Sequence, residues 1–462
     1  MNTKALRQKI LDLAIHGKLV PQDPNDEPAS VLLERIKAEK ERLIKEGKIK
    51  RSKQSKTACD KQHYPFELPE GWCWTTIDDI YFVTKLAGFE YTEYFTKDAI
   101  SPTNPVPIVR AQNVKMGRFI ENNNEAITVE LSEQLLRSAL YKDCLLMTFI
   151  GAGVGDTCIF HSNKRNHLAP NVAKIEPFNE HINMEYALFF FMSSLGQLGV
   201  TNISKSTAQA SLSMATIREL VIPIPPIKEQ SRITNEVTKW FSLIDCIEEN
   251  RNNLQETIKK AKSKILDLAI HGKLVPQDPM DEPASELLKR INPKAEKTCD
   301  NPHYRNLPQG WAVTSMQMLC SLVDGEKQNG IERINLDVKF LRGEREANTL
   351  SSGKYTAVNS LLILVDGENS GEVFRTPIEG YQGSTFKQLA INGNMNTEYV
   401  LQVINLHRKT LRENKVGSAI PHLNKKLFKA IEVPIPPYKE QQRIVNAISK
   451  AFTTLDAISE NL

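Results

Sequence analysis

The sixteen-residue stretch KILDLAIHGKLVPQDP occurs twice in this chain of 462 residues, at Lys9–Pro24 and again at Lys264–Pro279. An identical internal repeat constrains the architecture more strongly than local propensity, because both copies are expected to fold in the same way. The match continues outward, since NDEPASVLLERI at Asn25–Ile36 corresponds to MDEPASELLKRI at Met280–Ile291. The sequence therefore predicts two copies of one structural unit.

Two further segments repeat in the same order along the chain. CDKQHYPFELPEGW (Cys59–Trp72) corresponds to CDNPHYRNLPQGW (Cys299–Trp311). VIPIPPIKEQSRI (Val221–Ile233) corresponds to EVPIPPYKEQQRI (Glu432–Ile444). The repeated segments form a frame around two inserts that match each other only patchily.

A weaker match lies inside the inserts. LLMTFIGAGVGD corresponds to LLILVDGENSGE, so that Gly151 and Gly155 align with Gly367 and Gly371. Matched glycines between mismatched flanks indicate one backbone with different side chains. The two inserts are predicted to share one fold and to present two different surfaces.

A long helix is predicted over Ile227–Ile270, because its apolar positions alternate in steps of four and three, which is the spacing of a coiled-coil seam. The preceding Pro225 and Pro226 suit a helix start, and Gly272 suits a helix end. At 1.5 Å per residue the helix would be roughly 66 Å long. The seam positions, with one polar residue among them, are Ile233, Val237, Trp240, Ile244, Ile247, Arg251, Leu254, Ile258, Ala261, Ile265 and Leu268.

The two ends of the chain repeat the two halves of this helix. The carboxyl end repeats the first half, the amino end repeats the second, and only Asn252–Gln255 has no counterpart. The termini would together compose a second long helix, antiparallel to the central one. We expect Met1 and Leu462 to lie roughly 6 to 10 Å apart, from the helical rise of the missing residues.

Composition limits the class of protein. Hydrophobic residues make up 40% and charged residues 25% of the chain, which is typical of a globular protein of two or three domains. Seven cysteines without a CxxC pair favour a reducing, cytoplasmic location, and we expect no signal peptide or membrane anchor. A net charge of +4 is small, so any nucleic-acid binding must depend on local patches.

Several motifs in this order resemble the specificity subunit of type I restriction-modification enzymes: the two PIPPxxEQxRI elements, the two LPxGW elements and the two KxLxLAIxGKLVPQ helices. The resemblance covers essentially the whole chain. It implies an α+β fold in which two similar α/β target recognition domains are joined by a pair of long antiparallel coiled-coil helices in a pseudo-twofold, circular arrangement. The implied boundaries are 1–36 for the amino-terminal helix and turn, 37–62 for a basic linker, 63–226 for the first recognition domain, 227–291 for the central helix and turn, 292–437 for the second recognition domain and 438–462 for the carboxyl-terminal helix.

In that family each recognition domain reads one half of a bipartite, asymmetric DNA site, and the helices set the spacing and dock the methyltransferase subunits. The resemblance implies a chain without catalysis or cofactors of its own. Its implied partners are double-stranded DNA, two methyltransferase (modification) subunits and restriction (translocase) subunits. S-adenosylmethionine, ATP and Mg would belong to those partners.

Candidate DNA-binding residues are polar and cationic side chains on loops of the inserts, because base edges are read by Arg, Lys, Asn, Gln and Ser and phosphates by cations. The segments just before the two closing PIPP elements occupy corresponding places and are the stronger candidates. In the first insert the candidates are Arg110, Gln112, Asn113, Lys115, Arg118, Lys205, Ser206 and Gln209. In the second insert they are Lys339, Arg342, Lys387, Lys415, Ser418, His422 and Asn424.

Four other patterns have structural explanations that we favour. FIGAG (Phe149–Gly153) resembles a loop that holds S-adenosylmethionine, but Asn369 replaces the last glycine in the second copy. PIPPY (Pro434–Tyr438) resembles an adenine-binding motif, but an isoleucine cannot accept a hydrogen bond from the adenine amine. The basic run Lys37–Lys56 is typical of a solvated helix and linker. The pairs Cys59 with His63 and Cys299 with His303 have a CxxxH spacing, but each supplies only two zinc ligands.

Three alternatives stay open on the sequence. The chain could be an adenine methyltransferase through FIGAG, a coiled-coil scaffold that binds proteins alone, or the specificity component of a related two-subunit, type IIB-like system. Binding of S-adenosylmethionine would favour the first, and absence of DNA binding the second.

Overall fold

The computed structural model describes residues 2–51, 65–121, 124–179, 182–204, 210–293, 304, 306–416 and 421–461. The chain divides into two compact units, Met1–Glu249 and Asn250–Leu462, each of mixed helix and sheet. This confirms the predicted α+β class. The predicted distance between Met1 and Leu462 concerns two residues outside the described ranges and stays a prediction.

Unit 1 contains two four-stranded sheets, and the helix α9 begins in it. Its elements are α1 (Thr3–Ile15), α2 (Ala29–Lys45), β1 (Cys73–Thr76), α3 (Ile77–Ile80), β2 (Tyr81–Lys85), α4 (Gly88–Tyr94), β3 (Val106–Val109), η1 (Ala111–Asn113), β4 (Val114–Lys115), β5 (Arg118–Phe119), β6 (Ala126–Ile127), α5 (Val129–Gln134), η2 (Leu136–Ser138), β7 (Ala139–Leu140), β8 (Cys144–Thr148), β9 (Thr157–Phe160), β10 (Asn166–Leu168), β11 (Val172–Pro177), α6 (Met184–Met192), α7 (Ser194–Ile203), α8 (Met214–Arg218), β12 (Val221–Ile224) and α9 (Ile227–Ile270).

Unit 2 contains the end of α9, one four-stranded sheet and a small three-stranded barrel. Its other elements are α10 (Ala284–Ile291), β13 (Ala312–Ser315), α11 (Met316–Leu319), β14 (Cys320–Val323), β15 (Lys327–Leu336), α12 (Val338–Leu341), β16 (Thr349–Thr356), β17 (Leu361–Leu364), β18 (Val373–Arg375), β19 (Gly380–Gln382), β20 (Phe386–Ile391), α13 (Thr397–Glu413), α14 (Lys425–Ala430), β21 (Glu432–Ile435) and α15 (Tyr438–Glu460).

The central sheet is the same in both units. Unit 1 orders its strands β2-β11-β8-β9 and unit 2 orders the corresponding strands β14-β20-β17-β18, with antiparallel pairing throughout. A two-stranded antiparallel pair, β1-β12 in unit 1 and β13-β21 in unit 2, joins the LPxGW and PIPP segments. The predicted common fold of the inserts is confirmed for these sheets.

The remaining strands differ between the units. Unit 1 has a second four-stranded sheet, β6-β3-β10-β7, whereas unit 2 has the closed three-stranded arrangement β15-β16-β19. In unit 1 alternate residues of β8 face opposite sides, as strand geometry requires. Leu145 and Met147 join the core beneath the helices, and Cys144 and Leu146 join the core shared with the second sheet. The constant sheet therefore carries a different layer in each unit.

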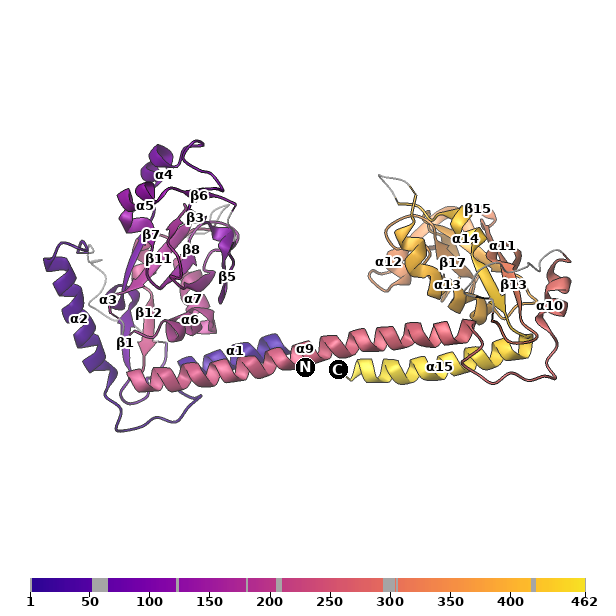
Figure 1. Ribbon diagram of the computed structural model, residues 1–462, viewed down its shortest axis with the longest axis horizontal. Coiled ribbons are helices and arrows are strands. Elements are labelled where there is room, and N and C mark those ends of the chain that lie inside the picture. Colours follow the sequence, from indigo (N-terminus) through magenta and orange to yellow (C-terminus); the bar gives the residue numbers. More distant parts are fainter. Residues whose placement is uncertain are drawn as a thin grey trace. The chain divides into compact units, whose positions relative to one another are not determined.

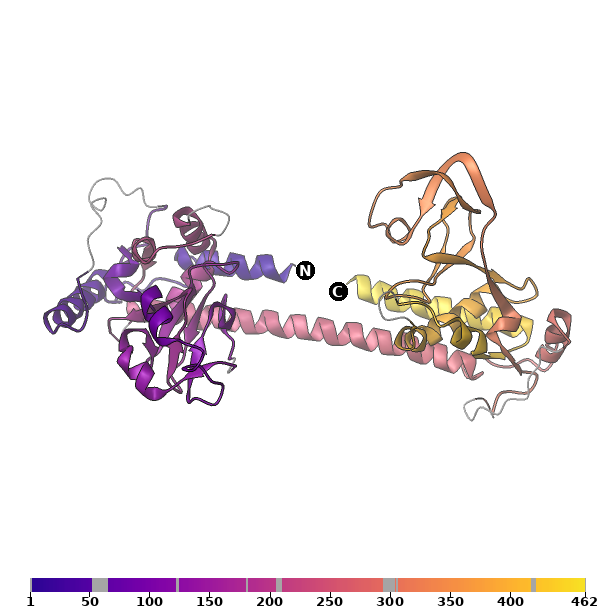
Figure 2. The ribbon, with the colours of Figure 1, turned by 90° about the horizontal axis from the view of Figure 1, so that it is seen from above.

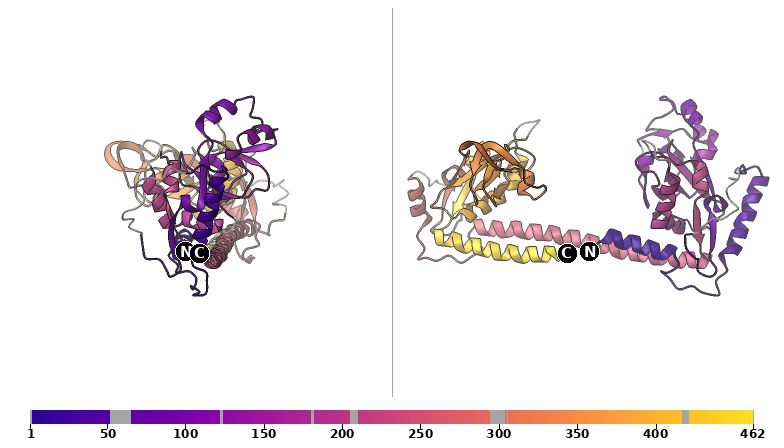
Figure 3. Two further views of the ribbon diagram at one scale, coloured as in Figure 1. Left: turned by 90° about the vertical axis from the view of Figure 1, so that its left-hand side faces the viewer. Right: turned by 180° about the vertical axis from the view of Figure 1, so that it is seen from behind.

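In each unit a shorter helix packs antiparallel to α9. In unit 1 the Arg7 guanidinium of α1 lies 2.6 Å from the Asp245 carboxylate of α9 and 5.1 Å from the Phe241 ring centroid. In unit 2 Lys262 of α9 pairs with Asp456 of α15 and lies 5.1 Å from the Phe452 ring centroid. Figures 1 and 2 show α1 beside the first part of α9, and Figure 3 shows α15 beside its last part from behind. The predicted helix Ile227–Ile270 is confirmed at both ends.

The predicted seam of α9 is buried only in part. Ile233, Val237 and Ile244 are buried, but Trp240 and Ile247 are 40% and 47% exposed. One neighbouring helix covers a narrow stripe of α9, and a straight helix drifts away from a strict 3.5-residue repeat. The expectation of a continuous buried seam was therefore wrong at these positions, which remain open on the surface.

A buried carboxylate joins the helix pair to the sheet in unit 1. Glu229, at the start of α9, is only 1% exposed. Its Oε2 accepts a hydrogen bond from Trp72 Nε1 at 3.0 Å and its Oε1 accepts one from Gln22 Nε2 at 3.1 Å. Burial raises the pKa of Glu229, and these two donors partly offset that effect. Three segments that are distant in sequence meet at this carboxylate.

The same joint recurs in unit 2. Glu440 at the start of α15 accepts hydrogen bonds from Trp311 Nε1 and Gln277 Nε2, both at 3.1 Å. Burial likewise raises the pKa of Glu440. We call these two sets of residues the joints: Gln22, Trp72 and Glu229 in unit 1, and Gln277, Trp311 and Glu440 in unit 2. The joints explain why the KLVPQ, LPxGW and EQxRI segments repeat together.

The helix that leads into each joint ends in the same way. Gly17 and Gly272 have φ of 65° and 66°, which glycine adopts without strain. A Cβ at Gly17 would lie 2.5 Å from Pro69, and one at Gly272 would lie 2.2 Å from Pro308, so the prolines of both LPxGW segments exclude a side chain there. His16 closes α1 by pairing its Nδ1 with the Asp12 carbonyl at 2.6 Å.

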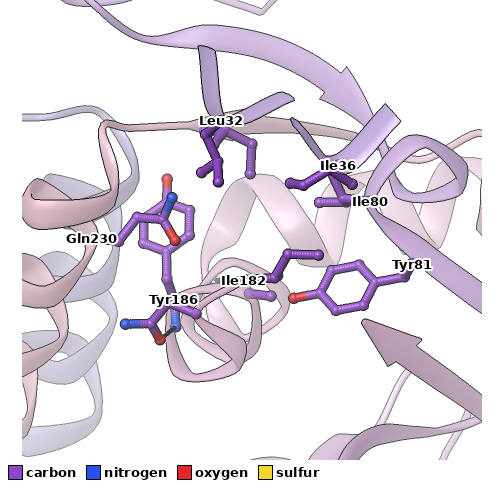
Figure 4. Close-up of a pocket in the computed structure, with 10 residues that line it drawn as sticks. Leu32, Ile36, Ile80, Tyr81, Ile182, Tyr186 and Gln230 are labelled. Atoms are coloured by element: carbon purple, nitrogen blue, oxygen red, sulfur yellow. Dashed lines mark hydrogen bonds between the residues drawn. The ribbon is translucent and has the colours of Figure 1, made fainter. Parts of the chain in front are cut away.

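A small cavity of about 10 Å³ lies beneath α2 in unit 1, between Leu32, Ile36 and Tyr186. Figure 4 shows the Tyr81 side chain at its edge. The Tyr81 hydroxyl is buried and has no hydrogen-bond partner among the described residues. At the corresponding start of β14, unit 2 has Cys320 in place of this tyrosine. The cavity could hold about one water molecule at most.

None of the described helices combines the length and the apolar composition that crossing a membrane requires.

We expect Trp72→Phe to lower the free energy of unfolding by about 1 to 3 kcal/mol, because one buried oxygen of Glu229 loses its donor. Trp311→Phe removes the matching donor from Glu440 and should have a similar effect. Chemical denaturation followed by circular dichroism measures both. Trp240→Phe, on the exposed side of α9, is the control and should change stability by less than about 0.5 kcal/mol. Equal losses in all three variants would contradict the assigned role of the joints.

Candidate nucleic-acid interface

The matched glycines form the same turn in both units. We call residues 150–156, between β8 and β9, and residues 366–372, between β17 and β18, the glycine turns. Gly151 and Gly367 have φ of 112° and 108°, and Gly155 and Gly371 have φ of 89° and 91°. The space around Gly151 and Gly367 is open, so backbone conformation alone explains the glycines there. The sequence match therefore identified one shared backbone.

The segment before each closing PIPP segment packs against the glycine turn where it is described; we call residues 204 and 210–213 of unit 1 and residues 414–416 and 421–424 of unit 2 the closing loops. In unit 1 Ile150 and Ser211 form an antiparallel bridge, and Leu212 N donates to Phe149 O at 2.8 Å. In unit 2 the corresponding bridge joins Asp366 and His422. The backbone pairing is thus shared, whereas the side chains at the bridge differ.

A third segment reaches the glycine turn in each unit. In unit 1 the β4-β5 hairpin is held by Gly117 N, which donates to Thr157 O at 2.8 Å, directly after the turn. Burial raises the pKa of Asp156 in the turn, and the charge of Lys115 on the hairpin lowers it in part. In unit 2 the segment after α12 supplies Arg342, which pairs with Glu372 at the end of the turn. In each unit, segments that are distant in sequence and rich in polar candidates therefore converge on the glycine turn.

The candidates of the β4-β5 region fall into two groups. Gln112, Lys115 and Arg118 are exposed. Asn113 is 2% exposed, and its amide accepts from Arg110 N and donates to Ile120 O, both at 2.8 Å. Both polar atoms of this amide are bonded to the backbone of the region, so we exclude Asn113 from the proposed base-reading residues.

Arg110 is also held internally, because its Nε lies 2.5 Å from a Glu125 carboxylate oxygen. Lys205, Ser206 and Gln209 lie outside the described residues, and their predicted roles stay predictions.

Most cationic candidates of unit 2 are paired with carboxylates. Lys415 lies 2.7 Å from Glu368 of the glycine turn, and Arg342 pairs with Glu372. Lys387 pairs at 2.5 Å with Asp324, whose pKa is held well below its usual range by hydrogen bonds from Lys354 and Lys387. Lys387 is therefore held by Asp324.

Four candidates of unit 2 remain. Lys339 is exposed, and His422 Nδ1 lies 2.6 Å from Asp366 Oδ1. Asn424 caps α14 by accepting a hydrogen bond from Leu427 N at 3.0 Å, which gives it a structural role. Ser418 lies outside the described residues.

A known protein family matches the sequence of this chain in two places. The family described as type I restriction modification DNA specificity domain matches the chain twice, at residues 70–256 and 310–462, which together exceed half of its length. The chain belongs to this family. It is a DNA-recognition subunit of a type I restriction-modification system.

Individual relatives agree with this family assignment. The EcoAI specificity subunit of Escherichia coli is 31% identical in an alignment 422 residues long, which covers 76% of this chain and 68% of that protein. The EcoEI specificity subunit of Escherichia coli is 32% identical in an alignment 342 residues long, which covers 62% of this chain but only 54% of that protein. A solved chain from a study of complex assembly and conformational transition of the type I R-M system has the same fold, with a TM-score of 0.57, 15% identity and coverage of 86% of this chain and 94% of its own.

The segments with other possible explanations have structural roles where they are described. In the basic run, α2 extends through Lys45, and Lys40 Nζ lies 2.8 Å from Asp78 Oδ2 and 5.4 Å from the Phe178 ring centroid. In PIPPY, Pro434 lies in β21 and its carbonyl accepts from Tyr399 Oη at 2.7 Å. FIGAG forms the first glycine turn.

The CxxxH pairs, Cys59 with His63 and Cys299 with His303, lie outside the described residues. Within the described ranges no group of three or more His, Cys, Asp or Glu side chains is placed to hold a metal ion.

Sequence reasoning missed the carboxylates of the second glycine turn. Selecting loops for their cations overlooked Asp366, Glu368 and Glu372, which pair with those cations. The match of LLILVDGENSGE to the first copy already contained these acids. Asp366 and Glu368 align with Ile150 and Ala152 of the first copy, and this difference was the available signal.

We expect Gly367→Ala to weaken DNA binding several-fold, because a Cβ at φ of 108° costs about 1 to 2 kcal/mol and shifts the turn. Gly393→Ala is the matched control in the same unit, since Gly393 has an ordinary φ and open space around it. Fluorescence anisotropy with one cognate duplex compares the two variants. Equal affinities would contradict a role for the turn in shaping the interface.

Proposed function

We propose that each unit reads one half of a bipartite, asymmetric site in double-stranded DNA through the surface around its glycine turn. The recognition domains would comprise residues 63–226 and 292–437. The observation that carries this proposal is the combination of an identical joint and central sheet with different second layers and different side chains at the turn. A constant frame with two different surfaces suits two unlike half-sites.

The exposed polar side chains near the turns supply the chemistry for reading DNA. In unit 1, Gln112, Lys115 and Arg118 are exposed on or beside the β4-β5 hairpin, which contacts the strand after the turn. Gln and Arg can form two hydrogen bonds with adenine and guanine edges, respectively, and Lys can neutralise phosphates. In unit 2, Lys339 and His422 are the corresponding exposed candidates.

The partners would be two methyltransferase (modification) subunits, joined by restriction (translocase) subunits. An apolar stripe on the surface of α9 supports docking of a helical partner. Trp240, Leu243 and Ile247 are 40%, 49% and 47% exposed, and their spacing places them on one face of the helix. Contiguous exposed apolar side chains of this kind are typical of interaction sites. Adenine methylation, S-adenosylmethionine, ATP and Mg would belong to these partners, and this chain would direct them to DNA.

Coexpression with its modification subunits tests the function. Single-molecule sequencing of genomic DNA should show methylated adenines in one bipartite motif, whose two halves are separated by a spacer of fixed length and arbitrary sequence. Methylation without sequence preference, or methylation in a continuous motif that is not divided into two halves, would reject the proposal.

The same experiment tests whether α9 sets the spacer. Inserting four residues after Asn252 would lengthen α9 by about 6 Å and rotate the remainder of the helix by about 40° beyond a full turn. We expect the spacer length to change while both half-sites stay the same. An unchanged spacer in the methylated motif would contradict the role of α9 in spacing.

Trp240→Glu and Leu243→Glu test the docking stripe. Each places a charge in an apolar contact, and we expect the affinity for the modification subunit to fall by about 30-fold or more. Asn235→Glu, at an exposed polar position of the same helix, is the matched control and should leave that affinity unchanged. Titration calorimetry measures binding, and circular dichroism verifies that the helices remain folded. Unchanged affinity in both stripe variants would exclude this face as the docking site.

A further inference from the structure

The two closing loops pair with their glycine turns at one equivalent bridge. In unit 1 the bridge residues are Ile150 and Ser211, and in unit 2 they are Asp366 and His422. The backbone on either side is bonded alike, since Leu212 N donates to Phe149 O at 2.8 Å and Leu423 N donates to Val365 O at 2.7 Å. Unit 2 therefore carries a hydrogen-bonding pair of side chains where unit 1 carries an aliphatic residue and a hydroxyl.

The imidazole of His422 is fixed on one side. Its Nδ1 lies 2.6 Å from Asp366 Oδ1. A carboxylate only accepts hydrogen bonds, so Nδ1 carries the proton in this contact. In the neutral tautomer that carries this proton, Nε2 is an acceptor, and the carboxylate does not engage it. The His422 side chain is 48% exposed, whereas that of Asp366 is 33% exposed.

The backbone also restricts His422. Its N–H donates to Val416 O at 2.8 Å, and its carbonyl accepts from Val416 N at 3.1 Å. The preceding carbonyl, that of Pro421, accepts from Gly367 N in the turn at 2.7 Å. Bonds to both the turn and the other side of the closing loop hold the residue, so its ring is placed before any ligand binds.

The charge around this bridge does not favour simple attraction of phosphate. Asp366 faces His422, and Glu368, two residues later, lies 2.7 Å from Lys415. Phosphate contacts require cations that are free to replace counterions, and Lys415 is already paired. A fixed acceptor beside neutralised charge is suited instead to a directional hydrogen bond with a base edge.

We propose that Asp366 is a positioning residue that orients His422, whose Nε2 accepts a hydrogen bond from an exocyclic amino group in the major groove, adenine N6 or cytosine N4, within the half-site read by unit 2. The inference rests on the proposed function, since it requires that unit 2 reads a half-site. It names the class of base group that is recognised and adds Asp366 to the residues that determine specificity.

The test uses the complex of the full chain with its modification subunits and a set of duplexes in which each base pair of the unit 2 half-site is replaced in turn. At one A·T or G·C pair, His422→Ala and Asp366→Ala should both reduce discrimination by roughly 5- to 100-fold, the range of one base-edge contact. Asp366→Glu retains the acceptor and should restore most of it. The unit 1 half-site serves as the internal control and should be discriminated as by the unmodified chain.

A second readout separates positioning from a general structural role. Replacing the affected adenine by purine, or the affected cytosine by 2-pyrimidinone, removes only the amino group. The unmodified chain should bind this duplex more weakly, and the two alanine variants should bind it as well as the normal duplex. Equal losses in all three proteins would overturn the inference.

The outcomes distinguish this inference from the proposed function. If the unmodified complex shows no base preference in any part of the unit 2 half-site, the proposed function fails. If it shows preference but both alanine variants keep it at every position, only the inference fails. A sensitive position whose only major-groove groups near the protein are those of guanine or thymine also overturns the inference, because neither base presents an amino group there.

Discussion

Burial of one carboxylate in each unit determines how the helices, sheets and loops are connected. Glu229 and Glu440 are each 1% exposed, and an ionised carboxylate at such a site requires donors on both oxygens. A tryptophan after the LPxG turn and a glutamine after the helix-ending glycine provide them. Removing either donor leaves one buried carboxylate oxygen without a hydrogen bond, so retaining the three segments together is favoured. This requirement explains why the frame repeats within the chain although the inserts do not.

The parts of each unit outside the joint differ between the two units. The central sheet, the glycine turn and the closing loop have the same backbone in both units, but the layer beside the sheet and the bridge residues differ. In unit 1 the turn approaches an exposed cationic hairpin, and in unit 2 it holds acids that pair with arginine, lysine and histidine. Two surfaces with different hydrogen-bonding chemistry on one backbone are well suited to recognising two different half-sites.

The long helix α9 has a buried apolar face and an exposed apolar face. One face packs against α1 in unit 1 and against α15 in unit 2, and Ile233, Val237, Ile244 and Ile258 are buried there. The residues between these positions in the heptad, such as Trp240 and Ile247, stay exposed because a single neighbouring helix covers only one stripe. An apolar face that the described part of the chain leaves uncovered is consistent with a subunit that assembles with partners.

The sequence by itself determined the repeated frame, the extent of α9, the helix end at Gly272 and the family, because periodicity, glycine conformation and motif order are local properties. It also located the polar segments around the interface, although it assigned the glycine turn only a structural role. The tertiary structure decided that these segments converge on the turn, that Asn113 is buried and that most cationic candidates of unit 2 are paired. It also decided that the seam positions Trp240 and Ile247 of α9 are exposed. These properties depend on which distant residues meet, and composition and spacing along one chain do not contain that information.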